Sequence, residues 1–195
     1  MSRALSVPEG EARPVVAVHM GRMSRVLGVN RADKVAHVQA GIRGADLEAA
    51  LNRQGFTCGH EPDSIEFSTL GGWIATKSSG MKQNRYGNIE SLVVDVRAVT
   101  ADGRVVSGAN AMRTSHGMVE LRDHAVGSEG NLFLITSATV RLFRLPDTVR
   151  YESILFRTFD DGHAFMHALS DVHSRPASVR LMDNAQLRLG QARSR

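Results

Sequence analysis

The stretch from Gly59 to Gly80 constrains the fold more than any other part of the sequence, because it places a polar loop directly before a short helix. Ser68 or Thr69 is a suitable N-cap for a helix over residues 70–79. The pair Gly71-Gly72 falls in the first turn of that helix, where glycine lowers helix stability. Glycines at such a place are suited to a backbone that another group approaches closely.

This stretch has two interpretations. A helix start with free N–H groups, hydroxyls at its rim and no side chain in the way is a good site for an anion or a cofactor. The alternative is a surface loop that runs into an ordinary helix. The usual motifs do not decide between them, since the sequence has no G-x-G-x-x-G, P-loop, H-E-x-x-H or C-x-x-C.

The stretch resembles the flavin loop of the alkyldihydroxyacetonephosphate synthase family, within the vanillyl-alcohol-oxidase superfamily of flavoproteins. The likeness extends from about Met20 over nearly all of the chain. The runs most specific to this family are Gly59–Ser64 and Arg180–Asn184, whereas the Gly-Gly element is common to the superfamily. The other matching runs are Glu66–Thr69, Gly71–Trp73, Ser79–Lys82, Tyr86–Glu90, Gly127–Gly130 and Ala177–Ser178.

The resemblance implies FAD as the cofactor and three segments as its contacts. The first segment would pass its backbone groups along the flavin, and the second would hold the neighbouring part of the cofactor. The third matches a Glu-Gly-Thr-Leu-Gly-Val-Ile run of the family. The segments are Asp63, Ser64, Ile65, Glu66, Phe67, Ser68 and Thr69; then Thr76, Lys77, Ser78 and Ser79; then Glu129, Gly130, Asn131, Leu132, Phe133, Leu134 and Ile135.

The chain departs from the family's third segment at two positions. Asn131 stands where the family has threonine, and it can still form hydrogen bonds. Phe133 stands where the family has glycine, and a benzyl group there is expected to displace either the strand or the cofactor. The alternative is that Phe133 turns into the core and the strand adjusts.

Arg180 is the predicted active-site residue. It alternates with apolar residues between Ser178 and Met182, so we expect it to face a different surface from its neighbours. Its planar, permanently charged guanidinium suits a phosphate or a carboxylate. The resemblance implies a position near the flavin and the substrate. The alternative is a salt bridge to Asp183 or Glu152.

Histidines offer two further hypotheses. His163 and His167 lie four residues apart on a predicted helix and could share a metal ion, but no third ligand is in view, so we predict no metal site. His60 and Glu61 could form an acid–base pair, although a polar contact within the loop is the simpler interpretation.

The composition is ordinary for a soluble globular protein, with 42% hydrophobic and 23% charged residues. No apolar run approaches the roughly 20 residues that span a membrane, and the first residues lack the apolar segment of a signal peptide. The single cysteine, Cys58, excludes an intrachain disulfide. The net charge of +4 comes with scattered arginines, which allows weak attraction to anionic membranes or phosphate-bearing ligands.

Apolar periodicity predicts strands that are mostly joined by short turns, with few helices. Residues 30–33 and 101–104 have turn composition, so each is expected to close a hairpin. Gly55 is expected to end a helix over residues 45–54. The predicted strands are 15–20, 25–30, 35–40, 92–99, 105–106, 132–142, 153–156 and 178–182, and the other predicted helices are 118–125 and 160–172.

These elements predict an α+β domain with a largely antiparallel sheet and flanking helices. By resemblance, residues 15–146 are the second subdomain of a PCMH-type FAD-binding domain, and residues 147–195 begin an α/β substrate-binding cap domain. Residues 1–14 have no clear apolar period and are expected to be disordered. The family's glycine-rich pyrophosphate loop, catalytic tyrosine and histidine run have no match here, so we expect the isolated chain to be inactive.

The resemblance implies an alkyl transferase of ether-lipid synthesis, which exchanges the acyl group of acyl-dihydroxyacetone phosphate for a fatty alcohol without net redox change of the flavin. The family is peroxisomal or glycosomal, and no targeting signal is visible. Two alternatives stay open: an FAD-dependent 2-hydroxy-acid oxidoreductase of the same superfamily, and a non-catalytic basic module for nucleic acid or anionic lipid. The main interpretation predicts no nucleic-acid partner and leaves peripheral membrane association and a homodimer open.

Overall fold

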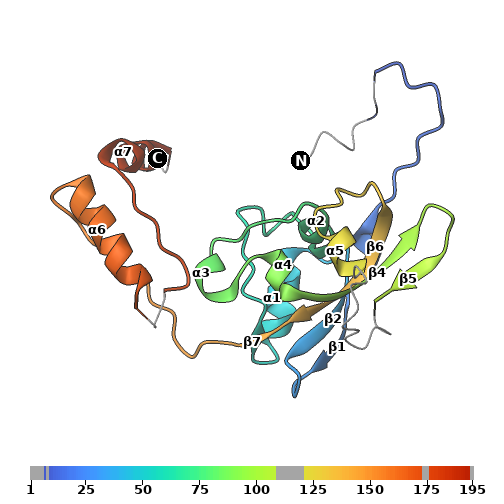
Figure 1. Cartoon of the computed structure of the whole chain (residues 1–195), viewed down its shortest axis with the longest axis horizontal. Helices are drawn as coiled ribbons and strands as arrows, with labels where there is room; N and C mark the ends of the chain where they lie inside the picture. Colours follow the sequence, from blue (N-terminus) through green and yellow to red (C-terminus); the bar gives the residue numbers. More distant parts are fainter. Residues whose placement is uncertain (1–6, 8, 109–120, 173–175, 194–195) are drawn as a thin grey trace. The chain divides into compact units, whose positions relative to one another are not determined.

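The computed structural model describes residue 7 and residues 9–108, 121–172 and 176–193. The chain forms two compact units, Met1–Leu145 and Pro146–Arg195, and each is described by itself (Figure 1). Half of the predicted disordered segment, residues 1–6 and 8, and the first residues of the helix predicted over 118–125 lie outside the described residues.

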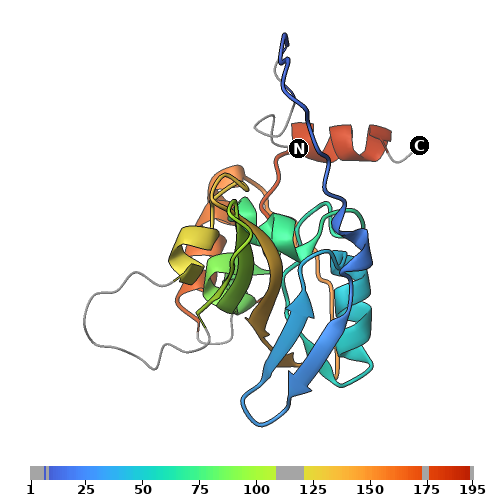
Figure 2. The ribbon, with the colours of Figure 1, turned by 90° about the vertical axis from the view of Figure 1, so that its right-hand side faces the viewer.

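A five-stranded antiparallel sheet with the order β1-β2-β6-β4-β5 forms the centre of the first unit. Two hairpins supply four of its strands, β1 (Val26–Asn30) with β2 (Val35–Gln39), and β4 (Val93–Thr100) with β5 (Val105–Ser107). β6 (Phe133–Arg141) lies between the hairpins and joins them, and Figure 2 shows the β1–β2 hairpin in blue. The predicted α+β class with a largely antiparallel sheet is confirmed.

Two helices contribute most to the core on this sheet. α1 (Gly44–Asn52) buries Leu47 and Leu51, as its helical period predicts, and Gly55 with φ +81° follows its end. α2 (Leu70–Ala75) buries Leu70, Trp73 and Ile74. These side chains join those of β2, β4 and β6 in one hydrophobic core, which fixes α2 against the sheet.

Short elements complete the first unit. β3 and β7 pair with each other in a separate two-stranded sheet. The short elements are the 3-10 helix η2 (Met20–Arg22), β3 (Phe56–Thr57), α3 (Gln83–Tyr86), α4 (Ile89–Leu92), α5 (Leu121–Ala125) and β7 (Phe143–Arg144).

The strand predicted over residues 15–20 is wrong. Residues 15–19 have no regular structure, and Val16 is 82% exposed. β-branched residues fit a pleated, half-buried surface, and no described strand pairs with this segment. The helix predicted over residues 70–79 also ends early, at Ala75, because Lys77 adopts φ +50°.

The second unit contains α6 (Phe159–Ser170) and α7 (Asn184–Arg193). α6 confirms the helix predicted over residues 160–172, whereas α7 was not predicted. Thr158 caps α6 by accepting a hydrogen bond from the Asp161 N–H at 3.1 Å. No helix in the described part of the chain is long and apolar enough to cross a membrane.

The strands predicted over residues 153–156 and 178–182 are wrong, because neither segment has a strand partner among the described residues. Both pack on α6 at Gly162 instead. A Cβ added at Gly162 would lie 2.7 Å from Leu181 Cδ1 and 3.2 Å from Phe156 Cδ2. The close approach of the two segments to the helix therefore takes the place of a strand pairing.

Candidate functional site

The two glycines of α2 have different surroundings. A Cβ added at Gly71 would lie 2.9 Å from Ala40 Cβ and 3.1 Å from Ala40 O, so this glycine allows α2 to pack against the end of β2. A Cβ added at Gly72 would meet only Thr69 Oγ1, at 3.3 Å, and Gly72 is exposed. One glycine therefore serves the fold, and the other leaves room for an outside group to approach, although the Gly72 N–H itself donates to Thr69 Oγ1 at 3.3 Å.

The loop before α2 is held by a few of its own polar groups. Ser64 O accepts hydrogen bonds from the Phe67 N–H at 2.9 Å and the Ser68 N–H at 2.8 Å. The Trp73 indole N–H donates to Ser68 Oγ at 2.7 Å, and Ile65 O accepts from the Ala45 N–H at 3.0 Å. These polar groups of Ile65 and Ser68 therefore stabilise the fold.

Other groups of the same loop are open to a ligand. The backbone N–H groups of Asp63, Ser64 and Glu66 have no hydrogen-bond partner among the described residues, and all three residues are exposed. The Phe67 side chain is 82% exposed. The first predicted segment therefore offers three amide donors and an aromatic face.

The second and third predicted segments meet at the end of α2. The Gly127 N–H donates to Ile74 O at 3.0 Å, and the Glu129 N–H donates to Ala75 O at 2.8 Å. Positive φ angles at Gly127, Glu129 and Lys77, of +83°, +50° and +50°, allow these turns to lie against the helix end. The segment 76–79 and the turn that leads into β6 are neighbours as a result.

A chain of backbone hydrogen bonds links the start of α2 to β6. The Gly71 N–H donates to Ala40 O at 2.8 Å, and the Ala40 N–H donates to Thr136 O at 2.9 Å. All three predicted cofactor segments are therefore gathered around α2, two at its ends and the third along the strand beside it (Figure 1).

The third segment divides between core and surface. Ile135 is buried, whereas Leu132 and Leu134 are 54% and 40% exposed. Phe133 begins β6, pairs with Thr100 and packs half-buried against the core. This packing supports the interpretation in which Phe133 turns into the core and the strand adjusts.

Ser128 was missed by the sequence reasoning. Its Oγ is buried and has no hydrogen-bond partner among the described residues, although it lies in the turn that contacts α2. Its place within the family-like run Gly127–Gly130, directly before Glu129, was the signal in the sequence. A ligand hydroxyl or a water at this turn would satisfy it.

His60 and Glu61 do not form an acid–base pair. Glu61 forms an ion pair with Lys82. His60 is buried, and its Nε2 lies 2.9 Å from Ser78 Oγ. Burial lowers the pKa of His60 to about 4, although the nearby Glu90 carboxylate opposes this shift. The structure thus supports the interpretation of polar loop contacts.

Cys58 is a buried structural thiol. Its Sγ and its backbone N–H both contact Glu48 Oε1, at 2.8 and 3.0 Å, and Thr57 Oγ1 donates to Glu48 Oε2 at 2.7 Å. Burial, followed by the Glu48 carboxylate, raises the pKa of Cys58 well above its usual value. The thiol is therefore protonated, and Thr57 and Cys58 together tie α1 to β3 and the residue that follows it.

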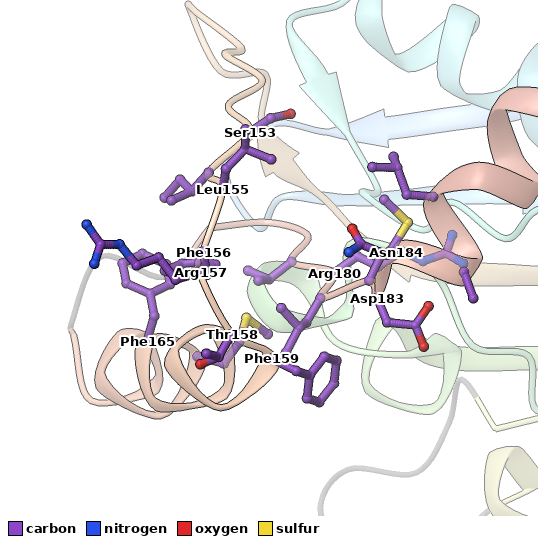
Figure 3. A pocket seen from close by; sticks show the side chains of 17 residues that line it. Ser153, Leu155, Phe156, Arg157, Thr158, Phe159, Phe165, Arg180, Asp183 and Asn184 are labelled. Atoms are coloured by element: carbon purple, nitrogen blue, oxygen red, sulfur yellow. The ribbon is translucent and has the colours of Figure 1, made fainter.

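Arg180 lies in the second unit, at a cavity of about 600 Å³. Figure 3 shows Arg180, Asp183 and Asn184 together on one side of this cavity, and Phe156 and Phe165 on the other. Arg180 is exposed while Val179 and Leu181 are half-buried, as the predicted alternation requires.

The alternative salt bridge of Arg180 is absent among the described residues. Asp183 Oδ1 accepts a hydrogen bond from the Gln186 N–H at 2.7 Å, so this carboxylate is used at the start of α7.

The histidines of α6 belong to no metal cluster among the described residues. His163 and His167 stack edge to face at 4.7 Å, and no group of three ligating side chains exists in the described part of the chain.

The groups around α2 fit FAD. The free amides of the 63–66 turn can donate to cofactor oxygens, and the open backbone at Gly72 allows close approach. The unsatisfied Ser128 hydroxyl supplies a further polar contact, while exposed Leu132 and Leu134 offer an apolar surface for a ring.

Comparisons with known proteins show which family this chain belongs to. The sequence model of the family described as FAD binding domain matches residues 3–109. The alkyldihydroxyacetonephosphate synthase of Caenorhabditis elegans is 43% identical over 192 residues, which make up 98% of this chain and 32% of that protein. The enzyme of the same name from Dictyostelium discoideum is 38% identical over 95% of this chain and 30% of its own length.

A solved structure shows the same likeness. A structure of an alkyldihydroxyacetonephosphate synthase superposes with a TM-score of 0.79 at 37% identity, over 89% of this chain and 32% of its own. The chain therefore spans about a third of the length of the relatives that it matches.

Proposed function

Since this chain belongs to the FAD binding domain family and is a homologue of the alkyldihydroxyacetonephosphate synthases, we propose that it forms one wall of the FAD site in an enzyme of their kind. The observation that carries this proposal is the convergence of three separate segments around α2. Backbone hydrogen bonds from Ala40, Gly127 and Glu129 hold that arrangement.

The proposed roles of the residues follow from their backbone groups that have no hydrogen-bond partner among the described residues. The N–H groups of Asp63, Ser64 and Glu66 donate to oxygens of the cofactor, and Gly72 lets it approach the helix backbone. Bound FAD supplies the reactive ring, and the protein's part is to bind, orient and polarise.

We propose that the whole enzyme exchanges the acyl group of acyl-dihydroxyacetone phosphate for a fatty alcohol. The Arg180 guanidinium supports this assignment, because it is exposed at a cavity with apolar walls and free of a carboxylate partner among the described residues. In this role Arg180 holds an anionic group of the substrate by paired hydrogen bonds. On the family resemblance, we also propose a peroxisomal or glycosomal location, with peripheral membrane association and homodimer formation to be tested.

The oxidoreductase alternative has less support. The Arg180–Asn184 run argues against a 2-hydroxy-acid oxidoreductase, and the relatives with 43% and 38% identity carry the synthase name. The basic-module alternative predicts steeply salt-dependent binding to nucleic acid and no flavin.

A chimera tests the proposal. The matching third of the Caenorhabditis elegans synthase is replaced by this chain, and the unmodified enzyme serves as the control. We expect a purified chimera with a stoichiometric flavin band that exchanges acyl-dihydroxyacetone phosphate with a labelled fatty alcohol. A folded chimera without flavin, or one whose flavin is reduced by a 2-hydroxy acid but shows no exchange, would refute the proposal.

A further inference from the structure

Two ring side chains lie buried between the first and the second cofactor segments. Trp73 is 2% exposed and His60 is 1% exposed, and their ring centroids lie 4.8 Å apart at an interplanar angle of 67°. This edge-to-face arrangement is one that packed rings prefer, so neither ring can turn without disturbing the other. The two rings therefore form one packed unit, the His60–Trp73 bridge.

Each ring of the bridge holds one cofactor segment by a hydrogen bond. The Trp73 indole N–H donates to Ser68 Oγ at 2.7 Å, and Ser68 belongs to the first segment. His60 Nε2 lies 2.9 Å from Ser78 Oγ, and Ser78 belongs to the second segment. A continuous path of side-chain contacts therefore runs from one segment to the other through the interior of the first unit.

The surroundings leave the bridge little freedom. A Cβ added at Gly44 would lie 2.4 Å from Trp73 Cζ2, and a Cβ added at Gly80 would lie 3.0 Å from His60 Nδ1. Only glycine allows the backbone to lie so close to the rings at these two points. Because closely packed interiors are hard to compress, a displacement of one ring is passed on to the groups that it contacts.

We propose that His60 and Trp73 are positioning residues that set the spacing between Ser68 and Ser78, and with it the fit of the site to FAD. This inference rests on the proposed function, in which both serines belong to cofactor segments, whereas the two rings lie outside the predicted segments. The backbone hydrogen bonds around α2 fix the helix, and the bridge fixes the two segments relative to each other. A site held in this way needs little reordering when the cofactor binds, so a displaced segment lowers the affinity.

The first test measures the bridge in the chain itself and needs no flavin. The backbone N–H groups of Ser68 and Ser78 are hydrogen-bonded within the chain, so NMR hydrogen exchange can follow both segments. His60→Leu should speed exchange at both amides about tenfold relative to the amide of Ala40 in the core. His37→Leu is the matched control, because this half-buried imidazole also contacts a serine hydroxyl, at 3.3 Å, but lies on β2. It should leave both ratios unchanged. If His60→Leu speeds exchange at Ser78 alone, or at neither amide, the two segments are not coupled and the inference is wrong.

The second test asks whether the bridge serves the cofactor, and it uses FAD and the chimera described above. His60→Leu should raise the dissociation constant of FAD about tenfold, whereas His37→Leu should leave it unchanged. His60→Gln keeps a polar atom for Ser78 and should restore most of the affinity. In a Ser78→Ala background, the two His60 variants should bind FAD equally, because His60 then has no hydroxyl to hold.

Two results of this second test would overturn the inference. Equal effects of His60→Leu and His37→Leu on FAD affinity would make His60 an ordinary core residue. A difference between the two His60 variants that persists without the Ser78 hydroxyl would show that His60 does not act through Ser78. If the chimera without these substitutions binds no FAD, the proposed function fails, while hydrogen exchange in the chain still decides whether the bridge couples the two segments.

Discussion

Replacement of Gly71 by alanine should destabilise the first unit, although alanine is the better helix former. The new Cβ would lie 2.9 Å from Ala40 Cβ and 3.1 Å from Ala40 O, so either α2 or the end of β2 must shift. Overpacking of this kind costs about 1–3 kcal/mol. The shift also strains the 2.8 Å hydrogen bond from the Gly71 N–H to Ala40 O, which is worth about 1 kcal/mol.

The gain in helix propensity offsets at most about 1 kcal/mol of this loss. We therefore expect Gly71→Ala to lower the free energy of unfolding by about 1–3 kcal/mol. For a chain of this size, that corresponds to a fall in Tm of several degrees. Urea unfolding followed by fluorescence of the buried Trp73 measures the difference directly.

Gly72→Ala is the matched control in the same turn. Its Cβ would meet only Thr69 Oγ1, at 3.3 Å, so its effect on stability should stay within about 1 kcal/mol of the wild type. In the chimera, however, it should weaken FAD binding more than tenfold, because it covers the open backbone. A Gly71→Ala variant as stable as the wild type, or a Gly72→Ala variant that loses stability but binds FAD normally, would refute this division of roles.

Four further outcomes are expected. Cys58 should react with a thiol reagent only as fast as the chain unfolds, because burial and Glu48 raise its pKa, and rapid labelling of native protein would contradict this. The pKa of His60 in the folded chain, about 4, lies below its usual 6.5, so the unfolded chain binds more protons between these two pH values. The free energy of unfolding should therefore fall by on the order of 2–3 kcal/mol as the pH is lowered from about 6.5 to 4. His60→Gln should remove that part of the pH dependence. Phe133→Gly should lower the free energy of unfolding by about 2 kcal/mol, because the ring packs half-buried against the core, and unchanged urea unfolding would show that the ring is dispensable. Arg180→Lys in the chimera should keep the fold and the flavin but lose most exchange activity, since lysine keeps the charge without the planar fork; near-normal turnover would exclude the role.

Local sequence signals predicted the elements that find a partner nearby in the chain. The β1–β2 and β4–β5 hairpins follow from alternating runs around turn residues, and α1 follows from Leu47 and Leu51 on one face. The same signals failed over residues 15–20, 153–156 and 178–182. These segments have strand-like composition, but a strand also needs a neighbouring backbone, and composition does not report whether one is present.

The candidate site was predictable as a set of segments but not as a set of contacts. Family resemblance identified the three segments, whereas the contact of His60 with Ser78, and the burial of Glu90 Oε2 and Ser128 Oγ without a partner among the described residues, depend on side chains brought together only by the fold. The adjacent pair His60-Glu61 suggested joint chemistry, yet the two side chains contact different residues, Ser78 and Lys82. Sequence adjacency in an irregular loop gives no information about the direction of side chains.

The arrangement of the site depends on backbone rather than side-chain chemistry. α2 has only six residues, which is too short to be stable alone, and it is fixed at its start by Ala40 and at its end by Gly127 and Glu129 through main-chain hydrogen bonds. A ligand that binds the free amides before α2 and the turn after it would therefore bridge segments that the sheet already holds in place. It follows that changes that loosen Ala40 or the 127–129 turn should weaken cofactor binding without touching the cofactor, because they displace the helix that aligns all three segments.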